Sequence, residues 1–307
     1  MSVAFISHPA CRLHNMGPRH PERPARLAAI EEQLHARGLY DFLVHHEAPR
    51  ATLEQLARVH PRGYVEGLAA RVPAEGLVHL DPDTAMCPDS FEAALRAAGA
   101  NVLAVDLVMR GEARRAFCSV RPPGHHAERD TAMGFCIFNN VAVGVAQALE
   151  AHGLERVAIL DFDVHLGNGT EDIFRRDDRV LICSTFQYPL YPNLSPGSVP
   201  GRIINCALPP GSGSDAFREV IARRWLPALD QFAPQLVFIS AGFDGHVADD
   251  LADLRLATVD FAWITEFACS VAARHAEGRV IATLEGGYEL AALAASAVVH
   301  IERLMHA

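Results

Sequence analysis

Residues 156–165 read RVAILDFDVH and predict a buried strand that ends in polar side chains. The first half is a continuous apolar run, which is typical of a strand covered on both faces. Alternate residues of an extended chain share a face, so Asp161, Asp163 and His165 should point to the same side where the strand ends. Burying two carboxylates and an imidazole is costly unless a partner compensates them. A divalent cation is such a partner, and mixed oxygen and nitrogen ligands suit zinc among others.

The rest of the chain alternates apolar strand segments with helical ones. Strands are predicted at residues 3–6, 116–120, 156–160, 180–184, 203–207, 236–240 and 280–284. Helices are predicted at residues 22–37, 61–71, 90–111, 139–152, 215–232 and 258–277, from Thr170 onward and at the carboxyl end. Such alternation predicts an α/β fold with a parallel sheet covered on both faces. No linker, composition break or internal repeat interrupts it, so residues 1–307 are expected to form a single domain.

The composition limits the classes of function. Half of the 307 residues are hydrophobic, and the formal net charge of −10 argues against nucleic acid or an acidic membrane as a partner. The seven cysteines are odd in number, widely spaced and without a CxxC pair, which is typical of reduced thiols in the cytoplasm. We find no signal peptide and no apolar run of membrane-spanning length, so a cytoplasmic protein is expected.

Unusual polar residues also follow other predicted strands. His125 and His126 come after the strand at 116–120, Asp244 after the strand at 236–240 and Tyr288 after the last strand. Each has an ordinary explanation on its own, such as a surface histidine pair, a capped turn or simple packing. In an open parallel sheet, however, ligands bind beyond the carboxyl ends of the strands. The coincidence of these residues at that edge therefore predicts one functional site.

These residue types suit the hydrolysis of an amide. Asp163, His165 and Asp244 would supply three zinc ligands and leave open positions for water and substrate. Zinc lowers the pKa of a water molecule and polarises a carbonyl oxygen. The Tyr288 hydroxyl could stabilise the oxyanion of the tetrahedral intermediate, and one histidine could carry the proton from water to the leaving amine. Asp161 is left to hold a histidine as an outer partner.

Six motifs contain these residues: RPPGHHA at 121–127, GFCIFNN at 134–140, DFDVH at 161–165, GNGT at 167–170, SAGFD at 240–244 and LEGGY at 284–288. Together they resemble the zinc-dependent histone deacetylase superfamily over nearly the whole chain. Asn168 and the segment HPERPAR at 20–26 are similar to class II and bacterial deacetylase-like members, which are related to acetylpolyamine amidohydrolases. The resemblance implies a three-layer α/β/α arginase-like fold around a central, mainly parallel sheet.

The resemblance also implies a role for each catalytic residue. Asp163, His165 and Asp244 match the zinc ligands, His126 the general base and acid, His125 its companion held by Asp161, and Tyr288 the oxyanion-stabilising tyrosine. Asn168 stands where class I members have an aspartate beside the second histidine, so we expect His126 to be less basic here. Leu166 stands where many relatives carry a histidine, and we assign it no role.

Further site residues follow from the same resemblance. Gly134 and Phe135 are expected in one wall of a substrate tunnel, Tyr191 in the opposite wall and Leu251 at the rim. Family members often hold a structural potassium ion, for which Asp161, Asp163, His165 and Ser184 would supply the ligands. The three zinc ligands would also accept ferrous iron, so the metal used in the cell stays open.

The sequence thus predicts a zinc-dependent amidohydrolase that removes acetyl or other acyl groups from amines, with acetyl-lysine peptides favoured. An acetylpolyamine deacetylase is the alternative, for which an acidic rim would be needed; the acids near the expected mouth are Asp81, Asp83, Asp89, Asp249 and Asp250. A manganese ureohydrolase and an inactive acyl-lysine binder also stay open. A ureohydrolase requires ligands for a second metal, and a binder does not require an intact catalytic set. Whether the chain forms a homo-oligomer is left open.

Overall fold

The computed structural model describes residues 3–194 and 197–306, and its centre is an eight-stranded sheet. The strands are β1 (Val3–Ser7), β2 (Val44–Glu47), β5 (Arg115–Cys118), β6 (Val157–Asp161), β7 (Val180–Gln187), β8 (Ile203–Leu208), β9 (Leu236–Ala241) and β10 (Val280–Leu284). Their order is β2-β1-β5-β10-β9-β6-β7-β8, and every neighbouring pair is parallel. The predicted α/β architecture with a mainly parallel sheet is therefore confirmed.

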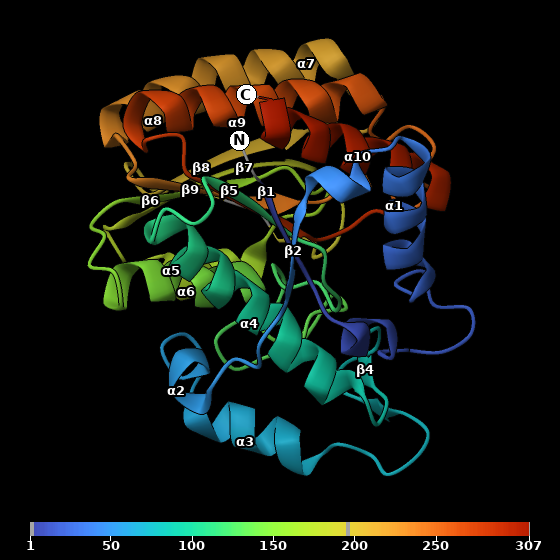
Figure 1. Cartoon of the computed structure of the whole chain (residues 1–307). Helices are drawn as coiled ribbons and strands as arrows, with labels where there is room; N and C mark the ends of the chain where they lie inside the picture. Colours follow the sequence, from blue (N-terminus) through green and yellow to red (C-terminus); the bar gives the residue numbers. More distant parts are fainter. Residues whose placement is uncertain (1–2, 195–196, 307) are drawn as a thin grey trace.

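Helices cover both faces of the sheet (Figure 1). One face carries α1 (Ala25–Ala36), α7 (Ser214–Val220), α8 (Leu226–Phe232), α9 (Thr258–His275) and α10 (Leu290–His306). The other carries α4 (Ser90–Met109), α5 (Asn140–Glu150) and α6 (Asn168–Phe174), with α2 (Leu53–Leu56) and α3 (Arg62–Ala70) further out. A short antiparallel hairpin, β3 (Val78–His79) and β4 (Ala85–Met86), precedes α4. None of the helices in the described parts of the chain has the length and apolar character needed to cross a membrane.

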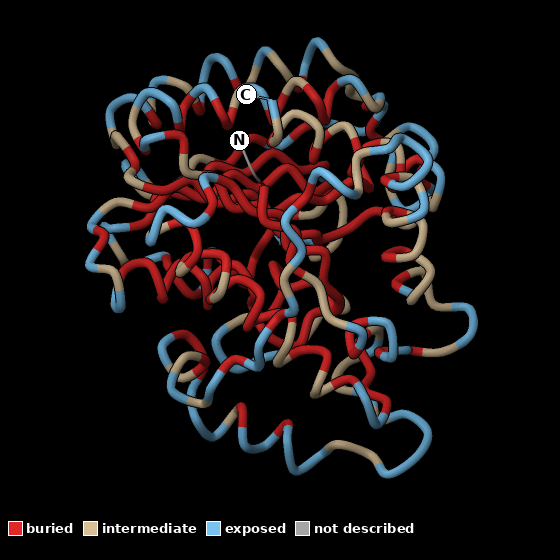
Figure 2. Tube along the Cα trace, in the orientation of Figure 1, coloured by how far each residue is buried: buried red, intermediate tan, exposed pale blue. Residues whose placement is uncertain are grey.

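The core lies along the middle strands, which Figure 2 shows as a continuous buried layer. Every residue of β5, β6, β7, β9 and β10 is buried. These strands are apolar over almost their full length because helices pack on both of their faces. Polar side chains appear where the strands end, at Asp161 and in the loops that follow. The sheet therefore provides a rigid, dry support for those loops.

Two predictions need correction. The helix predicted at residues 215–232 is divided into α7, a wider π-helical turn at Ile221–Trp225, and α8. Pro227, in the first turn of α8, has no N–H to donate to the preceding turn, which accounts for the interruption. β2 was not predicted, because this edge strand reads VHHE and is largely exposed, without an apolar alternation.

Candidate active site

The loops that follow four adjacent strands meet at one edge of the sheet. The order β5-β10-β9-β6 places the carboxyl ends of these strands side by side. The loop after β5 carries His125 and His126, the loop after β10 carries Tyr288, and the loop after β9 carries Asp244. Parallel strands present such ends on the same side, where ligands bind in open sheets. The fold therefore brings together residues that lie up to 163 positions apart, as between His125 and Tyr288.

Asp163, His165 and Asp244 converge closely enough to hold a metal ion, with one ligand atom from each residue lying within 4.8 Å of the others. Nδ1 of His165 lies 3.0 Å from Oδ1 of Asp163 and 3.3 Å from Oδ2 of Asp244. Burial alone would lower the pKa of the His165 imidazole, but the two carboxylates outweigh it and raise the pKa to about 10. The two carboxylates therefore favour a positive charge at this place.

The surroundings of this cluster fit a divalent cation. Oδ2 of Asp244 is buried and accepts no hydrogen bond within the described structure. Burial and the neighbouring Asp163 charge raise the pKa of the Asp244 carboxyl to about 6, and a nearby cation would offset this rise. A side chain at Gly286 would collide with the carboxylates of both aspartates, so only glycine leaves them room. Two carboxylates and one imidazole form a donor set that zinc and similar metals accept.

The tandem histidines have different partners and different charges. Nδ1 of His125 lies 3.1 Å from Oδ2 of Asp161, and Nδ1 of His126 lies 2.8 Å from Oδ1 of Asn168. Burial would lower the pKa of His125, but Asp163 and Asp161 raise it to about 10. Burial and the positive charges of the neighbouring histidines hold the pKa of His126 well below its usual range. His126 is thus the neutral member of the pair, able to accept a proton.

Two residues without a predicted role fix the loops that carry these groups. Oε2 of Glu285 accepts hydrogen bonds from the backbone N–H groups of Gly124 (2.6 Å) and His125 (3.1 Å). Arg26 donates to the backbone carbonyls of Gly287 (2.6 Å) and Glu285 (2.5 Å), and its guanidinium lies 4.9 Å from the centre of the Tyr288 ring. Their signal in the sequence was their place inside the LEGGY and HPERPAR motifs.

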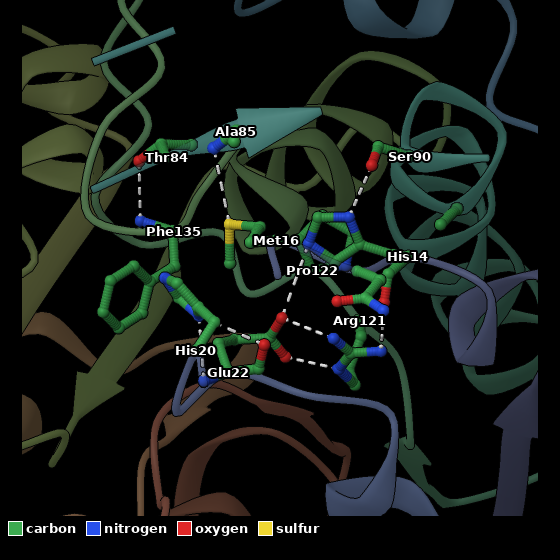
Figure 3. A network of polar contacts seen from close by, with 12 residues as sticks. His14, Met16, His20, Glu22, Thr84, Ala85, Ser90, Arg121, Pro122 and Phe135 are labelled. Atoms are coloured by element: carbon green, nitrogen blue, oxygen red, sulfur yellow. Dashed lines mark hydrogen bonds and ion pairs between the residues drawn. The ribbon is translucent and has the colours of Figure 1, made fainter. Parts of the chain in front are cut away.

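Figure 3 shows a buried ion cluster that joins Glu22 and His14 of the amino-terminal segment to Arg121. The carboxylate of Glu22 accepts hydrogen bonds from Arg121, at the start of the histidine loop, and from Arg26 at 3.1 Å. Nε2 of His14 lies 3.4 Å from the same carboxylate. Glu22, Arg26 and Arg121 are all fully buried. The cluster therefore supports these loops from within the protein interior.

A cavity of about 230 Å³ opens onto the candidate metal site. Its lining residues are Asp83, His126, Gly134, Phe135, His165, Leu190, Tyr191, Leu251 and Tyr288. The ring of Phe135 lies edge-on to Tyr288 at 5.8 Å, and that of Tyr191 edge-on to His126 at 5.1 Å. Gly134 packs so closely on the His126 ring that a Cβ atom there would lie 2.5 Å from Cδ2. Burial raises the pKa of the Tyr288 phenol, which keeps its proton available for donation.

The remaining predicted residues lie around this centre. Ser184 of β7 is paired in register with Asp161 of β6, and its buried Oγ has no hydrogen-bond partner within the described residues. Among the acids considered for the rim, Asp83 lines the cavity. Asp249 is buried and accepts backbone hydrogen bonds, and Asp81 accepts hydrogen bonds from the N–H groups of Asp83 and Thr84. The carboxylates of Asp81 and Asp249 therefore already accept hydrogen bonds from backbone groups of the protein.

The family model described as "Histone deacetylase domain" matches residues 20–304. The chain belongs to the histone deacetylase family. It is 40% identical to the histone deacetylase-like amidohydrolase of Pseudomonas aeruginosa, over 98% of this chain and 86% of that protein. It is 39% identical to a probable deacetylase of Archaeoglobus fulgidus, over 94% of this chain and 82% of that one. Family membership makes it a hydrolase of the deacetylase class.

Two further similarities add to this assignment. The crystal structure of the HDA15 HD domain superposes with a TM-score of 0.91 at 31% identity, covering 99% of this chain and 90% of that one. The agreement confirms the deacetylase-type fold around the eight-stranded sheet. The chain is also 35% identical to the human polyamine deacetylase HDAC10. The match covers 92% of this chain and 44% of HDAC10. The family thus includes a member named for a polyamine substrate.

Proposed function

We propose that this protein is a zinc-dependent deacetylase that hydrolyses acetyl-lysine side chains in peptides. The observation that carries the proposal is one cavity lined by a metal-ligand histidine, a neutral histidine and a protonated tyrosine: His165, His126 and Tyr288. Asp163 and Asp244 would complete the ligand set. When bound there, zinc would lower the pKa of water and polarise the acetyl carbonyl. Ferrous iron suits the same ligands.

The protein's own groups divide the remaining work. His126 accepts a proton from the attacking water and returns it to the leaving amine, so no net proton is consumed in the two transfers. Tyr288 donates a hydrogen bond to the oxyanion of the tetrahedral intermediate. His125, kept charged by Asp163 and Asp161, adds a fixed positive charge beside the same centre. Together these groups stabilise charge where it develops and pass one proton across the cavity.

The shape of the cavity favours a linear acylated amine. Phe135 and Tyr191 present their rings to its lumen, and Leu251 stands at its exposed rim. Two aromatic walls and a volume of about 230 Å³ suit the four methylene groups of a lysine side chain. Gly134 permits this narrowness because it brings the wall against His126. The substrate that fits is an extended acyl-lysine rather than a branched or bulky amide.

We further propose three properties that accompany this activity. Asp161, Asp163, His165 and Ser184 would hold a structural potassium ion, for which the unpartnered Oγ of Ser184 is the supporting observation. The chain would act as one catalytic domain, since its eight strands form a single sheet. The seven cysteines, all free and buried, suit a reducing compartment such as the cytoplasm.

Acetylpolyamine hydrolysis is the second candidate, and Asp83 is the observation that favours it. Its carboxylate lines the cavity, where it could attract a secondary ammonium group of an acetylpolyamine. The similarity to a human polyamine deacetylase points the same way. A manganese ureohydrolase receives less support, because a single group of converging metal-ligating side chains is found in residues 3–194 and 197–306.

The deciding experiment is kcat/KM of the zinc-loaded protein on an acetyl-lysine peptide, N-acetylputrescine and N8-acetylspermidine. We expect the peptide to be preferred. We also expect Asp83→Asn to change the turnover of the peptide less than it changes the turnover of the two acetylpolyamines. A large preference for the acetylpolyamines, abolished by Asp83→Asn, would replace the first proposal by the second. No turnover of any of the three by a protein that binds zinc would contradict both.

A further inference from the structure

Asn168 lies between the catalytic-loop histidine and a carboxylate that the mechanism above does not use. Its Oδ1 is 2.8 Å from Nδ1 of His126, and its Nδ2 donates a hydrogen bond to Oε1 of Glu128, also at 2.8 Å. The second Nδ2 hydrogen faces the sulfur of Met133 at 3.4 Å. Asn168 and His126 are each 4% exposed, and Glu128 is half-buried. The three side chains form a continuous chain that leads away from the cavity.

The chemistry of the carboxylate fixes the direction of this chain. An asparagine amide can present either its oxygen or its nitrogen to a neighbour, whereas a carboxylate only accepts hydrogen bonds. Glu128 therefore holds Nδ2 of Asn168 toward itself and turns Oδ1 toward His126. An acceptor at that place requires Nδ1 of His126 to carry the proton, which leaves the lone pair on Nε2. The opposite amide orientation would place the proton on Nε2 and remove the base.

We propose that Glu128 is a positioning residue that selects the Nδ1-protonated tautomer of His126 through Asn168. A carboxylate directly beside the histidine imposes that tautomer by itself, as the aspartate of a serine-protease triad does. In this chain the Asn168 amide could take either orientation, and Glu128 fixes that orientation through its hydrogen bond to Asn168. The tautomer preference stands on the hydrogen bonds alone. Its effect on turnover rests on the proposed function.

A series of substitutions changes the hydrogen-bond character of position 128 step by step. Glu128→Gln keeps the size of the side chain but allows either amide orientation, so kcat should fall at least about twofold with little change in KM. Glu128→Lys offers only donors and should turn the amide around, lowering kcat by about 100-fold or more, since a general base usually contributes about 10²- to 10⁴-fold. Packing alone would leave Glu128→Gln like the unchanged protein.

Asn168→Asp supplies the decisive partner variant. An aspartate at 168 accepts from Nδ1 of His126 with one oxygen and from a donor at position 128 with the other. Combined with Glu128→Lys, it should therefore restore kcat to within a few-fold of the Asn168→Asp protein. A structural role for Glu128 predicts instead that the two losses add. The control is Glu171→Gln in α6, where the carboxylate accepts a hydrogen bond from the Asn205 amide at 2.7 Å and has no contact with His126.

The tautomer is read directly by ¹⁵N NMR of the imidazole nitrogens in the zinc-loaded and the metal-free protein, with His126→Gln to assign the signals. We expect a single Nδ1–H tautomer in the unchanged protein, a mixture in Glu128→Gln, the Nε2–H form in Glu128→Lys, and Nδ1–H again in the double variant. An unchanged Nδ1–H signal throughout the series would overturn the proposal. Because this measurement needs no substrate, it decides the role of Glu128 even if the substrate proposed above is wrong.

Discussion

The carboxylate of Asp249 accepts a hydrogen bond from the backbone N–H of Tyr288 at 2.6 Å. The same oxygen accepts from the N–H of Glu289 at 3.0 Å, and the other accepts from the N–H of Leu251 at 3.1 Å. One buried side chain thus joins the loop at the rim of the cavity to the loop that presents the tyrosine. The position of the Tyr288 hydroxyl depends on a residue that does not itself face the cavity.

Asp249→Ala should therefore impair both stability and catalysis. Leaving partly buried N–H groups unpaired costs up to about 1–3 kcal/mol each, so we expect the free energy of unfolding to fall by roughly 2–4 kcal/mol. We also expect kcat to fall more than KM rises, because Tyr288 is proposed to stabilise the transition state. Urea unfolding and steady-state kinetics measure the two effects. Asp178→Ala, an exposed residue before β7 at the opposite end of the strands, serves as the control; equal kcat in both variants would refute the anchoring role.

Asp244→Asn should release the metal. It replaces one carboxylate of the converging group by a neutral amide, and loss of a ligand charge weakens a divalent site. We expect less than one-tenth of the zinc content of the unchanged protein by mass spectrometry after dialysis, together with loss of activity. Tyr288→Phe is the matched control, because it should keep full zinc content while kcat falls about 100-fold. Stoichiometric zinc in Asp244→Asn would show that the ion binds elsewhere.

The same tyrosine variant separates an enzyme from an acyl-lysine binder. A binder would hold an acetyl-lysine peptide equally well before and after Tyr288→Phe and turn over none of it. We expect instead measurable hydrolysis by the unchanged protein and a much slower release of acetate by the variant. Isothermal titration of the peptide alongside the acetate assay distinguishes the two outcomes.

Glu22→Gln should destabilise the protein strongly, because it leaves Arg26 and Arg121 buried without a counter-charge. Breaking such a buried cluster costs about 3–5 kcal/mol. Burial alone would raise the pKa of Glu22, but Arg121 and His14 hold it well below 4.5. The charged carboxylate therefore contributes stability above about pH 4.5, and this stability is lost as the pH falls below that value. Urea unfolding of the unchanged protein and of Glu22→Gln at pH 7 and pH 4 checks both points, because the difference between the two proteins should shrink at pH 4.

The exposed pair of Arg12 and Glu31 provides the comparison for the buried cluster. Glu31→Gln should lower the free energy of unfolding by less than about 1 kcal/mol, because water screens a surface pair. If Glu22→Gln cost no more than this, the buried cluster would not be what holds the catalytic loops together.

Acidification should also lower the free energy of unfolding, because the folded protein requires an unprotonated His60. Its Nε2 accepts the N–H of Asn139 at 3.0 Å and its Nδ1 lies 2.9 Å from the carbonyl oxygen of Arg129, so the folded state requires the neutral ring. Burial lowers the pKa of His60 from 6.5 to about 4. Between these values the unfolded chain binds one more proton, so the free energy of unfolding falls with pH by about 1.4 kcal/mol per unit, roughly 3 kcal/mol in all.

His60→Gln should reduce the slope of the free energy of unfolding against pH by about 1.4 kcal/mol per pH unit, which corresponds to one proton. Urea unfolding at pH 7, 6 and 5 measures this slope. The variant will be less stable at pH 7, so the slope rather than the absolute value is compared. His79→Gln, on the exposed hairpin, should leave the slope unchanged. An equal slope in all three proteins would mean that His60 becomes protonated in the folded state near its ordinary pKa.

Much of the fold could be predicted because buried parallel strands are apolar throughout. The prediction for the last strand, 280–284, matches β10 residue for residue, and that for 236–240 is one residue short. What failed had little local signal: β2 is polar and at the edge of the sheet, and the break before Pro227 depends on a single missing donor. The proposed metal ligands could be located because Asp163, His165 and Asp244 follow the ends of β6 and β9 within a few residues.

The residues that support the site were not predictable in the same way. Glu128, Asp249 and Glu285 act through backbone groups or amides brought near only by the fold, and a lone acid in a loop carries no periodicity that marks it. The expectation that Asn168 leaves His126 less basic than an aspartate would stays a prediction, which the pH–rate profile of Asn168→Asp tests. The low pKa of His126 has burial as its main cause, whereas the hydrogen bond to Asn168 acts in the opposite direction.

The strand synthesised last, β10, occupies the middle of the sheet between β5 and β9. Until residues 280–284 leave the ribosome, β2-β1-β5 and β9-β6-β7-β8 are two half-sheets with nothing to join them. Each half-sheet exposes an apolar edge that can pair with other chains. We therefore expect a message truncated before this strand to yield an aggregation-prone fragment rather than a smaller enzyme, and the nascent chain to need protection until β10 has emerged.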